Sequence, residues 1–154
     1  MKCKILILAL CLVLTMCGCS QEAPTSNDAV GTEESMEQVL IDNDLVKVTF
    51  EELYEESSIP DTCYVRLKVE NKSDKKVTVY PEETYVNDMG VTLCSGLPMV
   101  LEVGKSSRTP FFFTYKNLDI EGKDDIEKIE FKLTFEDENY NDVFKTDALT
   151  INLK

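Results

Sequence analysis

Residues 128–136 read Lys-Ile-Glu-Phe-Lys-Leu-Thr-Phe-Glu, the most regular stretch of the chain. Apolar and polar side chains alternate along it, and a period of two predicts a β-strand with one buried face. We expect the apolar positions to point into a core: Ile129, Phe131, Leu133 and Phe135. Because the chain has no tryptophan, Phe131 and Phe135 are our candidates for the side chains that fill the centre of that core.

The same alternation runs through most of the chain after Val39, in strands separated by turn-forming residues. The expected inward faces are Val46, Val48 and Phe50, then Cys63, Val65, Leu67 and Val69, then Phe111, Phe113 and Tyr115, and finally Leu149, Ile151 and Leu153. Residues 55–61 and 137–142 are typical of turns. No segment shows helical spacing over three turns, and residues 117–125 predict a loop with one helical turn.

Two of the turns predict hairpins. Asn-Lys-Ser-Asp at 71–74 is a tight polar turn, so we expect the strand that ends at Val69 to pair with the strand that begins near Val77. Asn-Asp-Met-Gly at 87–90 combines residues that favour turns, so residues 91–94 should return antiparallel to the strand before them.

Short strands with turns roughly every 8–12 residues indicate a β-sandwich or barrel. The folded part, residues 39–154, has about the length of an immunoglobulin-like domain. One apolar and one polar face per strand suits antiparallel sheets that are solvated on one side. We therefore predict an all-β fold, an immunoglobulin-like antiparallel β-sandwich of about 7–9 strands.

The N-terminal segment predicts an export signal. Residues 1–4 are basic and residues 5–16 are apolar, which is the length of a signal-peptide core and too short for a membrane-spanning helix. Gly18 before Cys19 resembles a bacterial lipobox, although Met16 and Cys17 depart from its usual Leu and small residue. An ordinary signal peptide and a short uncleaved anchor are the alternatives.

On the lipobox interpretation, residues 1–18 are a lipoprotein signal peptide and Cys19 carries the lipid. Two acyl chains on a diacylglycerol are enough for stable anchoring to the outer face of a bacterial cell membrane, whereas single chains bind only marginally. Residues 19–38 are acidic and lack aromatic residues, so we expect a disordered linker between the anchor and the domain.

The charge balance restricts the partners. The chain has 16 Lys and Arg against 29 Asp and Glu, a net charge of −13, which disfavours nucleic-acid binding. Anionic lipid headgroups should also repel it, so contact with the membrane must come from the anchor at Cys19. The chain has no histidine and no nucleophile, phosphate-loop or dinucleotide motif, so we expect neither an enzyme nor a cofactor.

Cys63 and Cys94 are the cysteines of the predicted domain, and two interpretations of them stay open. A disulfide is compatible with an exported protein. Two free thiols in or near the core are equally compatible with the alternation, which places Cys63 inward with Val65.

The acidic turn after residue 136 imitates the start of a calcium loop. Asp137, Asn139 and Asn141 occupy its first, third and fifth positions. However, Asp142 and Ala148 stand where an EF-hand requires Gly and Glu. We regard the loop as a weak calcium candidate and otherwise as a solvated turn.

The apolar stretch 97–101, together with Phe112, is the best candidate for an exposed contact patch. The alternative is an inner strand with ordinary aromatic core. Edge strands of the sandwich offer a second contact mode, in which a partner adds a strand to the sheet.

Residues 39–154 resemble the telokin-like, immunoglobulin-fold domain of unknown function found in small lipoproteins of low-GC Gram-positive bacteria, including gut clostridia. The resemblance rests on Val-Arg-Leu-Lys-Val-Glu-Asn-Lys-Ser-Asp-Lys at 65–75, Tyr-Val-Asn at 85–87 with Gly90, Val-Gly-Lys at 103–105, and Ile-Glu-Lys-Ile-Glu-Phe at 126–131. It implies the same fold and a lipid-anchored, extracytoplasmic location. It transfers no catalytic residue.

These observations predict a lipid-anchored, extracytoplasmic binding or adaptor module of unknown ligand, with a protein of the cell envelope as its expected partner. The alternative is a structural or assembly subunit of a cell-envelope complex that has no ligand of its own.

Overall fold

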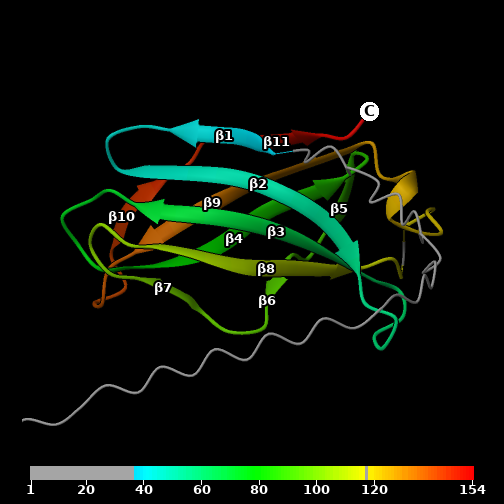
Figure 1. Ribbon diagram of the computed structural model, residues 1–154, viewed down its shortest axis with the longest axis horizontal. Coiled ribbons are helices and arrows are strands. Elements are labelled where there is room, and N and C mark those ends of the chain that lie inside the picture. Colours follow the sequence, from blue (N-terminus) through cyan, green and yellow to red (C-terminus); the bar gives the residue numbers. More distant parts are fainter. Residues whose placement is uncertain (1–36, 117) are drawn as a thin grey trace, which may run out of the picture. The chain divides into compact units, whose positions relative to one another are not determined.

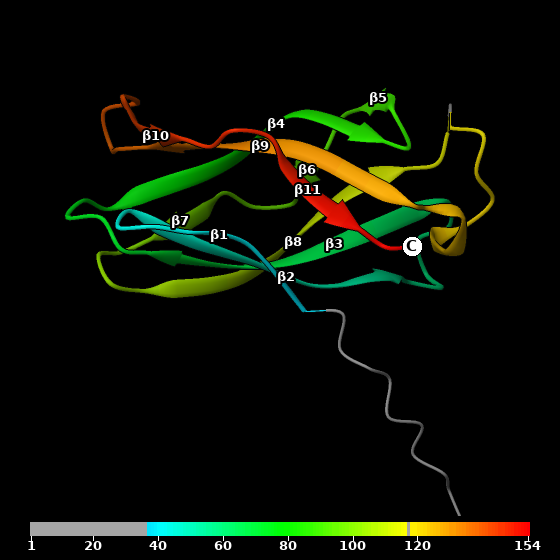
Figure 2. The ribbon, with the colours of Figure 1, turned by 90° about the horizontal axis from the view of Figure 1, so that it is seen from above.

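A computed structural model of the chain describes residues 37–116 and 118–154, and these form two stacked antiparallel sheets (Figures 1 and 2). The described residues contain eleven strands and one 3₁₀ turn: β1 (Gln38–Asp42), β2 (Val46–Glu55), β3 (Thr62–Asn71), β4 (Val77–Val86), β5 (Met89–Val91), β6 (Cys94–Ser95), β7 (Met99–Leu101), β8 (Ser106–Thr114), η1 (Lys123–Asp125), β9 (Lys128–Glu136), β10 (Asp142–Lys145) and β11 (Leu149–Asn152). No helix within these residues has the length and apolar character needed to span a bilayer.

The strand order confirms the predicted immunoglobulin-like sandwich. One sheet runs β1-β2-β3-β8-β6, and the other runs β10-β9-β4-β5, with β7 beside β4 and β11 beside β9. The orders β2-β3-β8-β6 and β10-β9-β4-β5 correspond to the A-B-E-D and G-F-C-C′ sheets of immunoglobulin domains. The structure has more strands than the predicted 7–9. The C-terminal segment forms two short strands, β10 and β11, and the segment between β4 and β8 forms three, β5, β6 and β7.

The core lies between the sheets, where the predicted inward faces meet. Phe131 and Phe135 are 1% and 3% exposed, and Phe50, Phe111 and Phe113 join them in the interior. The inward faces of β2, β3, β8 and β9 are all buried as predicted. Leu153 is the exception among the predicted inward residues, because it lies beyond the end of β11 and is only partly buried.

The predicted hairpin across residues 71–74 is wrong. Strand β3 pairs with β2 on one side and β8 on the other, while β4 belongs to the opposite sheet. The polar turn therefore carries the chain from one sheet to the other. Local turn chemistry does not distinguish these outcomes, because a tight polar connection serves a hairpin and a crossing equally well.

Asn71 holds this crossing in place from a position that is 2% exposed. Its Nδ2 donates to the carbonyls of Lys75 and Leu101 at 2.7 and 3.1 Å, and its Oδ1 accepts from the Ser73 backbone N–H and hydroxyl. Its backbone exchanges hydrogen bonds with the β7–β8 turn, at Lys105 and Gly104. One side chain therefore joins the β3–β4 and β7–β8 connections.

The hairpin after β4 is confirmed, with a shorter turn than predicted. Asn87 and Asp88 have φ values of 46° and 66°, so these two residues alone form the turn and Gly90 lies in β5 opposite Tyr85. Two positive φ values match the right-handed twist of the flanking strands. The predicted return over residues 91–94 is only partly correct, because β5 ends at Val91 and Cys94 pairs with β8 in the other sheet.

Two short strands were missed by the sequence analysis. Strand β10 begins at Asp142, the last residue of the predicted acidic turn, and β1 begins at Gln38, the last residue assigned to the linker. The Gln38 side chain donates to the backbone carbonyl of Asn152 at 2.6 Å. This contact fixes the start of the first strand beside the end of the last one.

Candidate functional site

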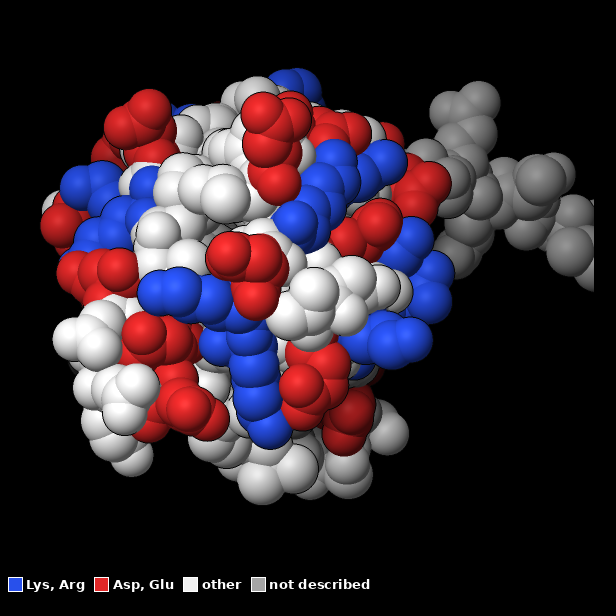
Figure 3. Space-filling model, turned by 90° about the vertical axis from the view of Figure 1, so that its left-hand side faces the viewer, with Lys and Arg blue, Asp and Glu red and all other residues white. Residues whose placement is uncertain are grey.

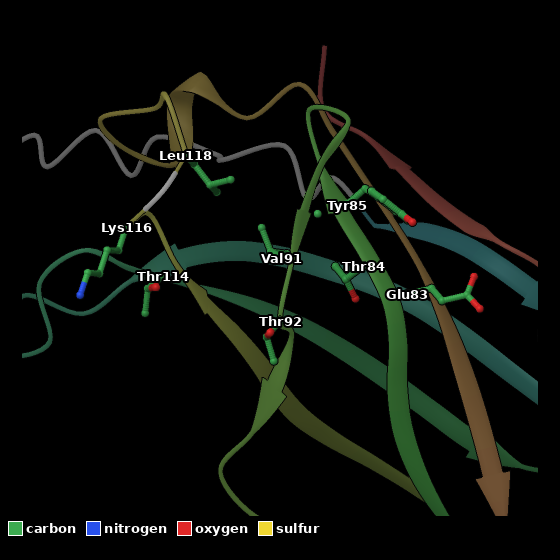
Figure 4. Close-up of a pocket in the computed structure, with 9 residues that line it drawn as sticks. Glu83, Thr84, Tyr85, Val91, Thr92, Thr114, Lys116 and Leu118 are labelled. Carbon is green, nitrogen blue, oxygen red and sulfur yellow. The ribbon is translucent and has the colours of Figure 1, made fainter.

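A cleft of about 550 Å³ opens between the β4–β5 hairpin and the end of β8 (Figure 4). We call it the β4–β5 cleft. Its lining comes from three separate segments: Glu83, Thr84, Tyr85, Gly90, Val91, Thr92, Thr114, Lys116 and Leu118. Ligand sites in proteins are commonly clefts of roughly 300–1,000 Å³, so the β4–β5 cleft has the size for a small molecule.

The edge of β4 next to the cleft is only partly covered by other strands. On that edge β7 pairs with residues 77–79 and β5 with residues 84–86, so residues 80–83 have no strand beside them in the described structure. Pro81 lies in this gap and has no N–H to offer an added strand. The gap is therefore open to solvent but unsuited to strand addition.

A β-bulge in β4, between Glu82 and Tyr85, changes the directions in which the neighbouring side chains point. The register of β4 against β9 shifts between Glu82 and Tyr85, and Glu83 has a φ of 42°. A non-glycine residue in this left-handed region is uncommon, and bulges are over-represented beside functional sites. As a result Thr84 is 5% exposed and lines the cleft, whereas Tyr85 and Glu83 are exposed.

The walls of the cleft offer hydroxyl groups and apolar surface. Thr84, Thr92 and Thr114 each contribute a side chain, and Val91 and Leu118 add apolar atoms (Figure 4). The Thr84 hydroxyl donates to the Glu82 carbonyl at 3.4 Å, which is a long hydrogen bond. This buried hydroxyl therefore retains the capacity to bond to a ligand.

The two charged residues of the lining differ in their partners. Glu83 forms an ion pair with Lys132 on β9, and this contact raises the pKa of the Lys132 ammonium. Lys116 is exposed and has no ion pair within the described residues. In Figure 4 the Lys116 side chain points away from Thr84 and Val91, so Lys116 places a positive charge without an ion pair, among the described residues, at the rim of the β4–β5 cleft.

A second pocket, of about 450 Å³, lies under the β2–β3 loop. Its lining includes the four carboxylates of Glu55, Glu56, Asp61 and Glu121, together with Tyr115. Glu55 accepts hydrogen bonds from the Tyr115 hydroxyl and from the Lys123 backbone N–H. Burial, together with the contact to Glu55, raises the pKa of Tyr115. The Glu55 carboxylate therefore serves to hold the β2–β3 and β8–β9 connections together.

The structure has Cys63 and Cys94 as free cysteines, so it does not contain the disulfide that was one of the two interpretations. Cys63 lies on β3 opposite Phe113, and Cys94 lies on β6 opposite Phe112, so β8 separates them. Strands two positions apart are about 10 Å apart, and a disulfide requires a Cα–Cα distance below about 7 Å. The alternation correctly placed Cys63 inward, where it is fully buried.

We expect the two thiols to react at very different rates. Burial raises the pKa of the Cys63 thiol to about 11, so at neutral pH it is both inaccessible and protonated. Cys94 is half-buried. In a protein of residues 19–154 that carries Cys19→Ser, a maleimide should label one thiol per folded chain and two in denaturant, as read by mass spectrometry. Native labelling that persists in a Cys94→Ser variant would contradict this arrangement.

Residues 137–141 of the calcium candidate form a turn between β9 and β10 that is held by its own hydrogen bonds. The Asp137 carboxylate accepts from the backbone N–H groups of Asn139 and Asn141 at 2.9 and 3.0 Å, and these bonds, with that from Asn141 first, lower its pKa. Asp142 lies outside this arrangement, in β10. In residues 37–116 and 118–154, no three His, Cys, Asp or Glu side chains are grouped so as to hold a metal ion.

Part of the apolar stretch 97–101 is an inner strand and part of it is exposed, so each of the two interpretations holds for some of its residues. Met99 and Leu101 are buried in β7, as an inner strand requires, whereas Leu97 and Val100 are 76% and 49% exposed. Phe112 lies on the outer face of β8, where its ring centroid is 5.9 Å from that of Tyr64. It is therefore a member of a cross-strand aromatic pair and is separate from the exposed edge at β7.

The end of the sandwich that carries the β3–β4, β7–β8 and β9–β10 connections has no patch of a single charge. Figure 3 shows basic and acidic side chains intermixed on this end. Lys76 pairs with Glu102 at 2.8 Å, and Lys75 lies 3.8 Å from Asp137. Ion pairs near the surface contribute little to stability, and these intermixed charges do not define a binding site.

The predicted signal peptide at 1–18, the lipidation site at Cys19 and nearly all of the linker at 19–38 lie outside the described residues. The cleft residues were missed by the sequence analysis. Threonines and a lysine at ordinary spacings carry no motif, and the bulge that brings them together leaves no signal beyond Pro81 and the acidic pair that follows it.

No protein-family model and no curated protein sequence matches this chain. A solved structure that resembles it is the crystal structure of a FixG-related protein from Vibrio parahaemolyticus, with 12% sequence identity and a TM-score of 0.39. The similarity covers 73% of this chain and 99% of that chain.

Proposed function

We propose that this chain is a lipid-anchored, extracytoplasmic binding module of a bacterial cell envelope. The observation that carries the proposal is the β4–β5 cleft, a ligand-sized opening in the side of a packed sandwich. The resemblance of residues 16–19 to a lipobox and the acidic composition of the predicted linker support the location. The module would work by presentation, with an anchor and a tether holding a rigid domain whose cleft and edges face the envelope.

The anchor is tested with a matched pair of variants. In a Gram-positive host, the wild-type chain should incorporate labelled palmitate and sediment with membranes. Cys19→Ser should abolish both, because the thioether cannot form, whereas Cys17→Ser should leave both unchanged. Labelling that survives Cys19→Ser, or is lost in Cys17→Ser, would overturn the assignment of Cys19.

The second candidate function is an assembly subunit of an envelope complex. The exposed apolar residues Leu97, Val100 and Val103 at the β7 edge favour it, because they offer a surface for a protein neighbour. Pull-down from detergent-solubilised envelope separates the two functions. A partner recovered at constant stoichiometry, and lost in a Leu97→Ser, Val100→Ser variant, would favour assembly over a ligand-binding module.

A further inference from the structure

We propose that the β4–β5 cleft binds a small monocarboxylate that has an apolar end. The exposed Lys116 side chain at the rim would turn toward the opening and pair with the carboxylate. Threonine hydroxyls would bond to the carboxylate oxygens, and Val91 and Leu118 would contact the apolar end. This inference rests on the proposed binding function and adds the chemical class of the ligand.

The charge of the cleft is the first argument. The whole chain has 29 acidic against 16 basic residues, and within residues 37–116 and 118–154 every lysine and arginine except Lys105 and Lys116 has an ion pair. Glu83 is the one carboxylate of the lining, and Lys132 neutralises it. A single negative charge on the ligand therefore matches the site, whereas a polyanion would meet the acidic field of the rest of the molecule.

The buried hydroxyl is the second argument. Thr84 is 5% exposed, and its hydroxyl has only the long bond to Glu82. A buried polar group with an incomplete set of hydrogen bonds gains free energy when a partner arrives. Thr92 and Thr114 extend the set of hydroxyls across the opening (Figure 4). Hydroxyl donors and an ammonium form charge-assisted hydrogen bonds to carboxylate oxygens.

The third argument is the apolar part of the lining. Val91 and Leu118 are half-buried and pack against the main core, so their cleft-facing atoms are held in place. Each ligand methylene that is buried against these atoms makes the binding free energy more favourable. A fully polar anion such as inorganic phosphate lacks this contribution and should bind less well.

Hexanoate, hexanamide and inorganic phosphate are the probes for this inference. The mature chain carrying Cys19→Ser, with ¹³C-labelled methyl groups, is titrated with each of them by NMR. Hexanoate should shift the methyl resonances of Val91, Thr92 and Thr114 saturably in the millimolar range. Hexanamide, which has the same shape without the charge, and phosphate should bind at least about fivefold more weakly.

Two variants and a control complete the test. Lys116→Gln should weaken hexanoate binding about fivefold and leave hexanamide unchanged, because it removes only the charge. Thr84→Val keeps the shape and removes the buried hydroxyl, so it should also weaken binding severalfold. Lys105→Gln, at an exposed lysine in the β7–β8 turn, should have no effect.

Absence of saturable shifts with hexanoate, equal binding of hexanamide, or unchanged binding in Lys116→Gln would each overturn the inference. None of these outcomes bears on the anchor, since palmitate labelling and membrane sedimentation are read independently. A failed titration with a normal Cys19 result would leave a lipid-anchored module whose ligand is of another class.

Discussion

Replacing Phe131 with alanine should lower the free energy of unfolding by about 3–5 kcal/mol. Phe131 lies in the middle of β9, the strand that pairs with β4, β10 and β11, and it is 1% exposed. The substitution removes a ring from the layer where the two sheets meet. The packed sheets cannot close around the space, so a cavity cost adds to the lost burial. Urea denaturation of the mature chain measures the change.

Lys132→Ala is the matched control for Phe131→Ala. Lys132 is the next residue of β9, and its side chain points to solvent, where it pairs with Glu83. Loss of an exposed ion pair should move the denaturation midpoint little. If the two substitutions shifted the midpoint equally, the assignment of inward and outward faces along β9 would be wrong.

Replacing Asn71 with alanine should cost about 2–3 kcal/mol, although the residue contributes nothing to the apolar core. The substitution leaves the carbonyls of Lys75 and Leu101 without their donor, and the Ser73 hydroxyl without its acceptor. Each buried polar group left unpaired costs about 1–3 kcal/mol, less whatever water recovers. Urea denaturation again gives the value, with Asn139→Ala in the exposed β9–β10 turn as the control.

Asn71→Asp separates the hydrogen-bond explanation from a simple loss of packing. The aspartate has the same size but replaces the Nδ2 donor with an oxygen that faces carbonyl groups. Ionisation is then disfavoured in the folded state, so the pKa of the new carboxyl rises above its unfolded value of about 3.9. The stability of this variant should therefore fall as the pH rises above about 4. A pH-independent loss equal to that of alanine would contradict the proposed network.

Side-chain alternation predicted the faces of the strands but not their pairing. A buried face is a local property that a period of two reveals, and it correctly placed Cys63, Phe111 and Phe131 in the core. Whether the next strand pairs in the same sheet depends on what else occupies the neighbouring edge. Strand β3 already has β8 beside it, a contact between residues more than 35 positions apart, so β4 joins the other sheet.

The β4–β5 cleft could not be predicted from the sequence for a related reason. The lipidation site is a local motif, so the sequence predicts Cys19, and that assignment stays a prediction. The β4–β5 cleft depends on a bulge at Glu83 and on side chains from three segments that meet only in the fold. Thr84 shows the difficulty, because simple alternation with Val86 marks it as inward but nothing in the sequence shows that it faces an opening.

The residues that carry the resemblance to the telokin-like lipoprotein domains now have a structural explanation. The stretch 65–75 ends in the Asn71 crossing, and the stretch 103–105 supplies the turn to which Asn71 bonds. These two parts of the pattern contact each other and hold the two sheets together. They are therefore informative about the fold and carry no information about a ligand, and membership of that family stays a prediction.

The contact between Gln38 and Asn152 makes the domain suitable for circular permutation. The two natural ends of the sandwich are already adjacent, so a short glycine-rich peptide could join Lys154 to Glu37. New ends could be opened in the exposed β9–β10 turn, which Figure 1 places at the opposite end of the sandwich from the C-terminus. A lipobox fused to the new N-terminus would attach the sandwich to the membrane through its opposite end. Comparing this permuted protein with the wild-type chain in cells would test whether the orientation of the domain matters for its function.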